Sequence, residues 1–209
     1  GIGVEFIRQL KRRRTFVAFL LVVALPLIVV AAVRFGPSSN GDAGSSQGGG
    51  FGGGNFDLVG LATSGAWNFT ITMLLFSSGF LLVIIVAMFL GDTVASEASW
   101  STLRYLLVAP VPRRKLLRTK AVVGLLLTAI VLLTLVLASW AIGAIAFGTA
   151  PLASPFGGAL TQIESLQRLT VITTYIAITL LFPAAIAFLM SVLTDVPLGA
   201  VGTAVVVVT

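Results

Sequence analysis

The chain has 209 residues, of which 57% are hydrophobic and 10% are charged, and its formal net charge is +6. Soluble globular domains carry about a quarter charged residues, so this composition excludes a water-soluble domain and predicts an all-α, polytopic membrane protein. The chain contains no Cys and no His, which excludes disulfides, thiolate nucleophiles, imidazole bases and the commonest zinc sites.

The first predicted element is a short amphipathic helix over residues 2–14. At about 100° per residue its apolar side chains share one arc, which holds Ile2, Phe6, Ile7 and Leu10. Its polar side chains share the other arc, which holds Glu5, Arg8, Gln9, Lys11 and Arg12. This pattern favours an interfacial helix anchored to the membrane surface by Arg12, Arg13 and Arg14. A cytoplasmic extension of the first span, which needs only its positive charges, is the alternative.

Apolar runs long enough to cross a membrane follow, since a hydrocarbon core of roughly 30 Å needs about 20 residues of helix. The predicted spans are residues 15–33, 67–90, 121–147, 171–193 and 198–209. The last run is still apolar where the sequence stops, so we expect the remainder of this span and a sixth span beyond it. Residues 1–209 then form a single transmembrane domain.

Basic residues lie mainly on one side of these spans. Five precede the first span, six lie around the second-to-third connection, and Arg34 and Arg168 remain for the other side. The positive-inside rule places the N-terminus and the 91–120 loop in the cytoplasm and the 34–66 loop, with its Gly/Ser-rich stretch, outside. We therefore expect a multi-pass protein of the plasma membrane, in a bacterium the inner membrane, whose basic residues serve topology and lipid contact rather than nucleic-acid binding.

The 91–120 loop is longer than a turn between adjacent helices needs. Ser101 and Thr102 can cap a short helix that Pro110 then ends. Three leucines recur within it at i, i+3 and i+4 spacing: Leu103, Leu106 and Leu107. The pattern predicts a leucine-faced helix projecting into the cytoplasm. An anchored, lipid-facing loop is the alternative. We expect Lys115 and Lys120 to anchor this part of the chain at the membrane surface.

This loop resembles the cytoplasmic signature of type-2 ABC transporter permeases. That signature reads approximately Glu, then Gly-Thr-Leu, a Leu pair, Pro-Val-Ser-Arg and a Lys before the third span. The matching residues here are Glu97, Thr102, Leu103, Leu106, Leu107, Pro110, Val111, Arg113, Leu116 and Lys120. Ser101 stands in place of the Gly, and Pro112 in place of the Ser. The order of the interfacial helix, external loop and long inner loop is also similar over the whole chain.

The resemblance implies a permease subunit of an ATP-driven exporter that pairs with a second permease copy or a homologue. It implies cytoplasmic ABC ATPase subunits that bind ATP and Mg²⁺, so this chain would be no enzyme and would hold no cofactor. The residues implied to dock on the ATPase, as a coupling helix, are Glu97, Thr102, Leu103, Arg104, Leu106, Leu107, Pro110 and Arg113. Asp195, ahead of the fifth span, would make a second cytoplasmic contact.

The charged residues themselves agree with an external energy source. All seven carboxylates lie outside the middle of the predicted spans, whereas ion-coupled carriers usually keep an ionisable group there. The spans hold neutral hydroxyls instead, and packing between helices explains most of them. A membrane-embedded enzyme, or a non-transporting assembly factor or channel subunit, is the alternative function.

Three smaller signals complete the pattern. Pro26 and Pro183 lie within the first and fourth predicted spans and can kink them, either as hinges or for packing. The triplet that starts at Asn68 fits a glycosylation sequon, but it lies at the membrane edge, and we interpret it as a chance match.

Overall fold

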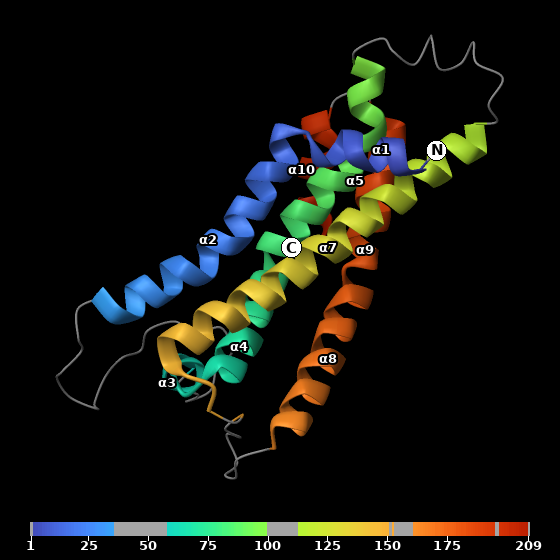
Figure 1. The fold of residues 1–209 in the computed structure, drawn as a ribbon. Helices are drawn as coiled ribbons and strands as arrows, with labels where there is room; N and C mark the ends of the chain where they lie inside the picture. Colours follow the sequence, from blue (N-terminus) through green and yellow to red (C-terminus); the bar gives the residue numbers. More distant parts are fainter. Residues whose placement is uncertain are drawn as a thin grey trace.

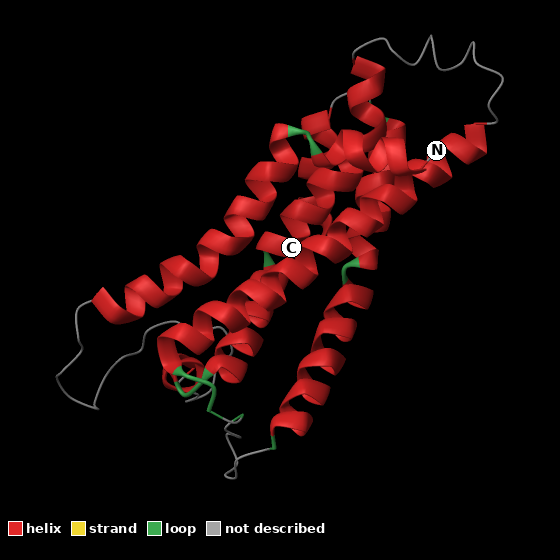
Figure 2. Cartoon of the chain, viewed as in Figure 1, coloured by secondary structure: helices red, strands yellow, loops and turns green. Residues whose placement is uncertain are grey.

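The computed structural model describes residues 2–35, 58–99, 113–150, 152, 161–194 and 197–208, and these ranges are almost entirely helical (Figures 1 and 2). No strand occurs among them. The helices are α1 (Ile2–Leu10), α2 (Arg13–Phe35), α3 (Leu58–Thr63), α4 (Ala66–Gly79), α5 (Leu81–Ser99), α7 (Arg113–Phe147), α8 (Gln162–Thr179), α9 (Leu181–Leu193) and α10 (Pro197–Val208).

Three segments are long and apolar enough to cross a membrane: Arg13–Phe35, Leu117–Phe147 and Gln162–Leu193. A fourth, Ala66–Gly79 with Leu81–Gly91, passes the same test as a pair. This all-helical architecture with apolar spans agrees with the predicted helical membrane protein. Helix α10 has 12 residues, fewer than a membrane crossing requires.

The second predicted span, residues 67–90, is two helices rather than one. α4 and α5 meet at Phe80, whose φ of −141° and ψ of −57° are not helical, and the pair is bent by 53°. Small residues allow this bend, because Ser77, Ser78 and Gly79 precede it directly. The bend gives the two halves different neighbours: α4 packs mainly against α7, and α5 packs most extensively against α9 and α10.

The fourth predicted span also differs, because the helix begins at Gln162 rather than near residue 171. Thr161 caps it: the Thr161 N–H donates to the Glu164 carboxylate at 2.9 Å, and the Thr161 hydroxyl accepts from the Glu164 N–H at 3.4 Å. This capping box satisfies amide groups that the first turn leaves unpaired. Thr161-x-x-Glu164 was therefore the sequence signal for the true start.

The same helix is interrupted at Leu180, three residues before Pro183. Pro183 has no N–H to donate to the carbonyl of Thr179, so the interruption falls where the predicted kink requires it. Pro26 behaves differently, because α2 runs without interruption from Arg13 to Phe35.

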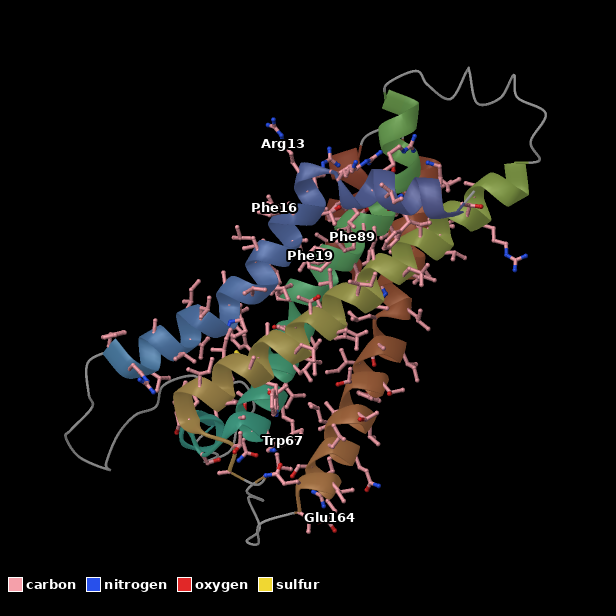
Figure 3. All side chains as sticks on the ribbon, in the orientation of Figure 1. Arg13, Phe16, Phe19, Trp67, Phe89 and Glu164 are labelled. Atoms are coloured by element: carbon pink, nitrogen blue, oxygen red, sulfur yellow. The ribbon has the colours of Figure 1, made fainter. Side chains whose placement is uncertain are left out.

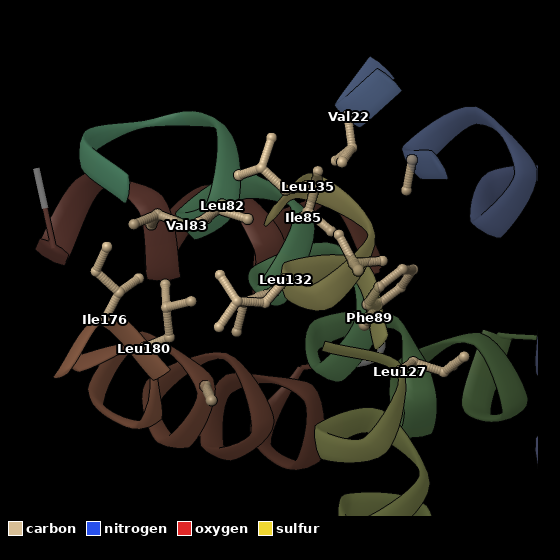
Figure 4. Close-up of a cluster of buried hydrophobic side chains, with 14 of the residues drawn as sticks. Val22, Leu82, Val83, Ile85, Phe89, Leu127, Leu132, Leu135, Ile176 and Leu180 are labelled. Atoms are coloured by element: carbon tan, nitrogen blue, oxygen red, sulfur yellow. The ribbon is translucent and has the colours of Figure 1, made fainter. Parts of the chain in front are cut away.

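The main core of the bundle lies around α5 (Figure 4). Residues from α2, α5, α7 and the α8–α9 interruption meet there: Val22, Leu82, Val83, Ile85, Phe89, Leu127, Leu132, Leu135, Ile176 and Leu180. Gly124 of α7 lets this helix come close to α5, since a Cβ at Gly124 would lie 3.0 Å from Cγ of Leu90. Small residues of this kind are common where membrane helices approach closely.

The two ends of the bundle gather different chain segments (Figure 1). One end holds α1, the start of α2, the end of α5 and the start of α7. We call it the basic end, because residues 8–14 and 113–120 bring ten of the 13 Lys and Arg to it. The opposite end holds α3, the start of α4 and the start of α8. Helix α3 falls within the predicted external loop 34–66, where no helix was expected, and packs against α4.

Candidate partner-docking and membrane-interface sites

The predicted coupling segment is bounded by two helices of the bundle core. Residues 100–112, with Thr102, Leu103, Arg104, Leu106, Leu107 and Pro110, lie outside the described residues. Glu97 falls near the end of α5 and Arg113 begins α7, but their side chains are outside the description too, as is Asp195. What the structure supplies is the setting: the segment joins α5 to α7, and these helices pack against each other.

Both flanking helices are buried well toward the predicted coupling segment. Leu90 and Gly91 of α5 and Val123 and Gly124 of α7 are buried, and Leu90 contacts Gly124. A displacement of the segment would reach these packed positions through the last turns of α5 and the first turns of α7.

The N-terminal amphipathic helix ends earlier than predicted. α1 stops at Leu10, and Arg13 and Arg14 already belong to α2, so a single helix over residues 2–14 is wrong for its last four residues. A hydrogen-bonded corner separates the two helices. The Lys11 N–H donates to the Ile7 carbonyl at 3.1 Å, and the buried Thr15 hydroxyl donates to the Gln9 carbonyl at 2.7 Å.

The burial of the side chains of α1 also differs from the predicted division into an apolar and a polar arc. Phe6 packs against the main core, and Gln9, which was assigned to the polar arc, is only 5% exposed. Ile7 and Leu10 are 55% and 43% exposed. The physical reason is that α1 packs against α7 with a face that lies between the two predicted arcs, so the bundle takes up Phe6 and leaves Ile7 and Leu10 outside.

The predicted surface anchors divide into two groups. Arg13 and Arg14 are exposed and Arg12 is half-buried, and the Arg13 side chain points away from the bundle (Figure 3). Lys120 is only 3% exposed, so its ammonium group is held within the protein rather than at the membrane surface. The side chain of Lys115 is outside the described residues.

A polar cluster at the opposite end was not anticipated from the sequence. The Trp67 indole N–H donates to Oε1 of Gln162 at 2.9 Å, and the Gln162 amide donates to the Thr149 carbonyl at 3.1 Å. We call these three residues the polar clamp, because they tie α4 and the segment directly after α7 to the start of α8. No local signal predicts it, since Trp67 and Gln162 are 95 residues apart.

Arg34 has a role at this end that its isolated position in the sequence did not reveal. Its Nη2 donates to the Ala146 carbonyl at 2.7 Å, in the last turn of α7. A positive charge is favourable there, because the C-terminal end of a helix carries partial negative charge. Arg34 thereby joins α2 to α7.

The Asn68 side chain is not accessible for glycosylation. Asn68 is buried, and its Nδ2 donates to the Ser64 hydroxyl. This burial agrees with a chance match to the sequon.

A shallow apolar groove of about 260 Å³ lies beside the α8–α9 interruption. It is lined by Thr128, Ala129, Leu132, Thr174, Ala177, Ile178, Leu180 and Leu181. Both threonine hydroxyls bond to their own helices, Thr128 to the Gly124 carbonyl at 3.0 Å and Thr174 to the Thr170 carbonyl at 2.8 Å. The groove therefore presents mainly hydrocarbon. Within the described residues, no group of three acidic side chains gathers to form a metal site.

Residues 53–208 match the model of a family described as DUF2705, a protein of unknown function. The match covers more than half of the chain and runs from just before α3 to the end of α10, so it includes the predicted coupling segment. No curated protein and no solved structure matches the chain.

Proposed function

The chain belongs to the DUF2705 family, and we propose that it is the membrane-spanning permease subunit of an ATP-driven ABC exporter. The observation that carries this proposal is the pattern of residues 100–112, with three leucines at helical spacing before Pro110, placed between two core helices. A short leucine-faced helix in that position suits docking on a cytoplasmic partner.

The proposal places the basic end in the cytoplasm of a cell with this protein in its plasma membrane. Ten basic residues at that end support the orientation, because positive residues are retained on the cytoplasmic side. ABC ATPase subunits would bind ATP and Mg²⁺ and contact the 100–112 segment, with Asp195 as a second contact. A second permease copy or a homologue would complete the transporter.

The helix contacts suggest how motion would spread from the docked segment. Closure of the ATPase pair would displace residues 100–112 and with them the end of α5. α5 packs against α9, α10, α7 and α4, so its displacement reaches most of the bundle. The polar clamp holds α4 and α8 at the opposite end. The bend at Phe80 and the interruption at Leu180 are therefore where α5 and α9 would move relative to α4 and α8.

The apolar groove at Leu180 would accept hydrocarbon, either from a membrane lipid or from an amphipathic or lipid-like cargo. It lies midway along two of the candidate spans, and hydrocarbon lines most of it. A strongly polar cargo would lose its hydration there without gaining hydrogen bonds in return.

The test is affinity purification of the full-length protein from native membranes, followed by identification of the ATPase subunit retained. We expect native protein to retain an ATPase with a phosphate-binding loop and the Leu106→Asp, Leu107→Asp variant to lose it at least about tenfold, because two charges would be desolvated at the interface.

Tyr105→Asp is the matched control, because helical spacing puts Tyr105 on the side opposite to Leu106 and Leu107. This variant should retain the ATPase. Absence of any ATPase from the native preparation, or equal retention by both aspartate variants, would contradict the proposal.

A further inference from the structure

Exposed apolar and basic side chains lie together where α1 turns into α2. Ile7 and Leu10 of α1 are exposed, and Phe16, one turn into α2, is 68% exposed. Four exposed basic residues surround them: Arg8, Lys11, Arg13 and Arg14. We call these seven residues the basic corner. Figure 3 shows Arg13 projecting beyond the end of α2, with Phe16 directly below it on the same helix.

The scaffold of the basic corner is held rigidly. Phe6 packs into the main core and Gln9 is buried, so α1 is fixed to the bundle on its other face. The Arg12 carbonyl accepts from the Thr15 N–H at 3.0 Å, and the buried Thr15 hydroxyl bonds back to α1. The basic side chains are therefore displayed from a defined surface and not from a free tail.

The electrostatics of the basic corner favour an anion. Two arginines begin α2, and its first turn contains no acidic residue. The N-terminal end of a helix carries partial positive charge, so the helix end and the arginines add to the same positive potential, which attracts anions. The exposed side chains of Ile7, Leu10 and Phe16 require hydrocarbon at the same place.

We propose that the basic corner binds the phosphate headgroups of anionic phospholipids in the cytoplasmic leaflet. A lipid interface supplies negative charge and hydrocarbon within a few ångströms of each other, which matches the two kinds of side chain. An acidic soluble protein would supply the charge but would have to bury three separate apolar side chains. The inference rests on the membrane placement in the proposed function, and it is independent of the ATPase partner.

Site-specific quenching tests this directly. The chain has no Cys, so Leu10→Cys introduces a single attachment point for an environment-sensitive fluorophore. The full-length protein is reconstituted in phosphatidylcholine nanodiscs that contain equal small fractions of acyl-chain spin-labelled phosphatidylglycerol or spin-labelled phosphatidylcholine. We expect phosphatidylglycerol to quench the fluorophore several-fold more effectively, and this preference to decrease at high salt because the Debye length shortens.

Removing charge from the basic corner should remove the preference. In Lys11→Gln with Arg13→Gln we expect the several-fold preference to fall to near parity, because each basic residue at an anionic surface contributes at most about fivefold. Arg168→Gln, an exposed arginine at the opposite end, is the matched control and should leave the preference unchanged. A fluorophore at Ile163→Cys, also at that end, should show no preference in the native background.

The inference would be overturned by equal quenching by the two lipids in the native background, or by a preference that survives both high salt and the double substitution. Absence of quenching by either lipid would also overturn it, because the basic corner would then lie outside the bilayer interface. These outcomes leave ATPase co-purification unaffected, so the two proposals fail separately.

Discussion

Two glycines of α7 set how closely that helix approaches its neighbours: Gly124 beside α5 and Gly143 beside α4. A Cβ added at Gly143 would lie 3.0 Å from Cδ1 of Phe69 and 3.2 Å from the backbone Cα of Ala66. A side chain could rotate away, but a backbone atom in α4 cannot yield without moving the helix. Gly143 therefore keeps α4 and α7 in register beside the ring contact between Trp67 and Trp140, whose centroids are 6.0 Å apart.

We expect Gly143→Val to destabilise the protein by about 1–3 kcal/mol, because the added atoms overpack the α4–α7 contact. Gly202→Val is the matched control, since nothing lies within 4 Å of the Cβ position at Gly202 in α10. Thermal unfolding in detergent, followed by helical circular dichroism, measures both. Equal midpoints for the two variants would show that the α4–α7 contact is less tight than the structure indicates.

Among the helices, two discontinuities meet near the middle of the bundle. Leu82 and Val83, just after the bend at Phe80, lie in the same core cluster as Ile176 and Leu180 (Figure 4). The causes differ: small residues precede the first, and a proline follows the second. α7 runs without interruption from Arg113 to Phe147, and α4 and α5 pack against it, whereas α9 packs against α5 and α10.

Pro183→Ala should make α8 and α9 more nearly continuous, because the substitution restores a backbone N–H that can donate to the Thr179 carbonyl. Ile163 and Leu193 are both exposed, so spin labels can be attached at Ile163→Cys and Leu193→Cys. The distance between the two labels, measured by electron–electron resonance, gives the end-to-end length of α8 and α9 together. A straight helix would separate these positions by about 45 Å. We expect the distance distribution in Pro183→Ala to lengthen toward that value and to narrow.

Pro26→Ala provides the comparison, because it also removes a proline from a span but lies in α2, outside the helices that carry the labels. α2 already runs through residue 26 without interruption. With the same label pair it should leave the distribution unchanged. An unchanged distribution in Pro183→Ala would mean that packing in the bundle, and not the missing N–H, maintains the interruption at Leu180.

At the level of the whole molecule, the two ends differ in chemistry. The basic end displays cationic side chains, whereas the opposite end is joined by the polar clamp and by the bond from Arg34 to Ala146. Helix α3 adds to that end, because its Ala62 is buried with Phe69 and Met73. The opposite end thus includes packed structure directly after the predicted external Gly/Ser stretch.

We expect deletion of residues 38–50 to leave folding intact, because a stretch so rich in Gly and Ser has little apolar surface to bury. Deletion of Leu58–Thr63 should reduce stability, because it removes the packed helix α3. Size-exclusion profiles and unfolding midpoints of the purified proteins distinguish these outcomes. Loss of folded protein in the first deletion would contradict the prediction.

Much of the element pattern could be predicted from the sequence. Residues 15–33 and 121–147 were placed correctly within α2 and α7, since long apolar runs have few alternatives in a chain of this composition. The start of α8 was misplaced by nine residues, because the amphipathic turns around Arg168 hid a capping signal at Thr161. The bend at Phe80 was missed because hydropathy shows that a segment is apolar but not whether its helix axis changes direction.

The candidate sites were predictable to different degrees. The coupling segment was inferred from residue types and spacing, and it remains a prediction, because residues 100–112 lie outside the described ranges. The polar clamp could not be inferred, since Trp67 and Gln162 become neighbours only when α4 and α8 pack. Lys120 and Gln9 were wrongly assigned to exposed surfaces for the same reason. Helical periodicity predicts which side chains share a face of a helix, but it does not predict which other helix covers that face.

Sequence alone determined that this chain is helical, which segments are apolar enough to span a membrane, and that its positive charge is concentrated around two segments. Those properties follow from composition and local spacing, which act within one turn or one helix. Tertiary structure decided that α1 rests on α7, that Lys120 is buried, and that Ile7, Leu10 and Phe16 share one exposed corner with the arginines. Contacts between helices distant in sequence set these features, and such contacts depend on how the helices pack together.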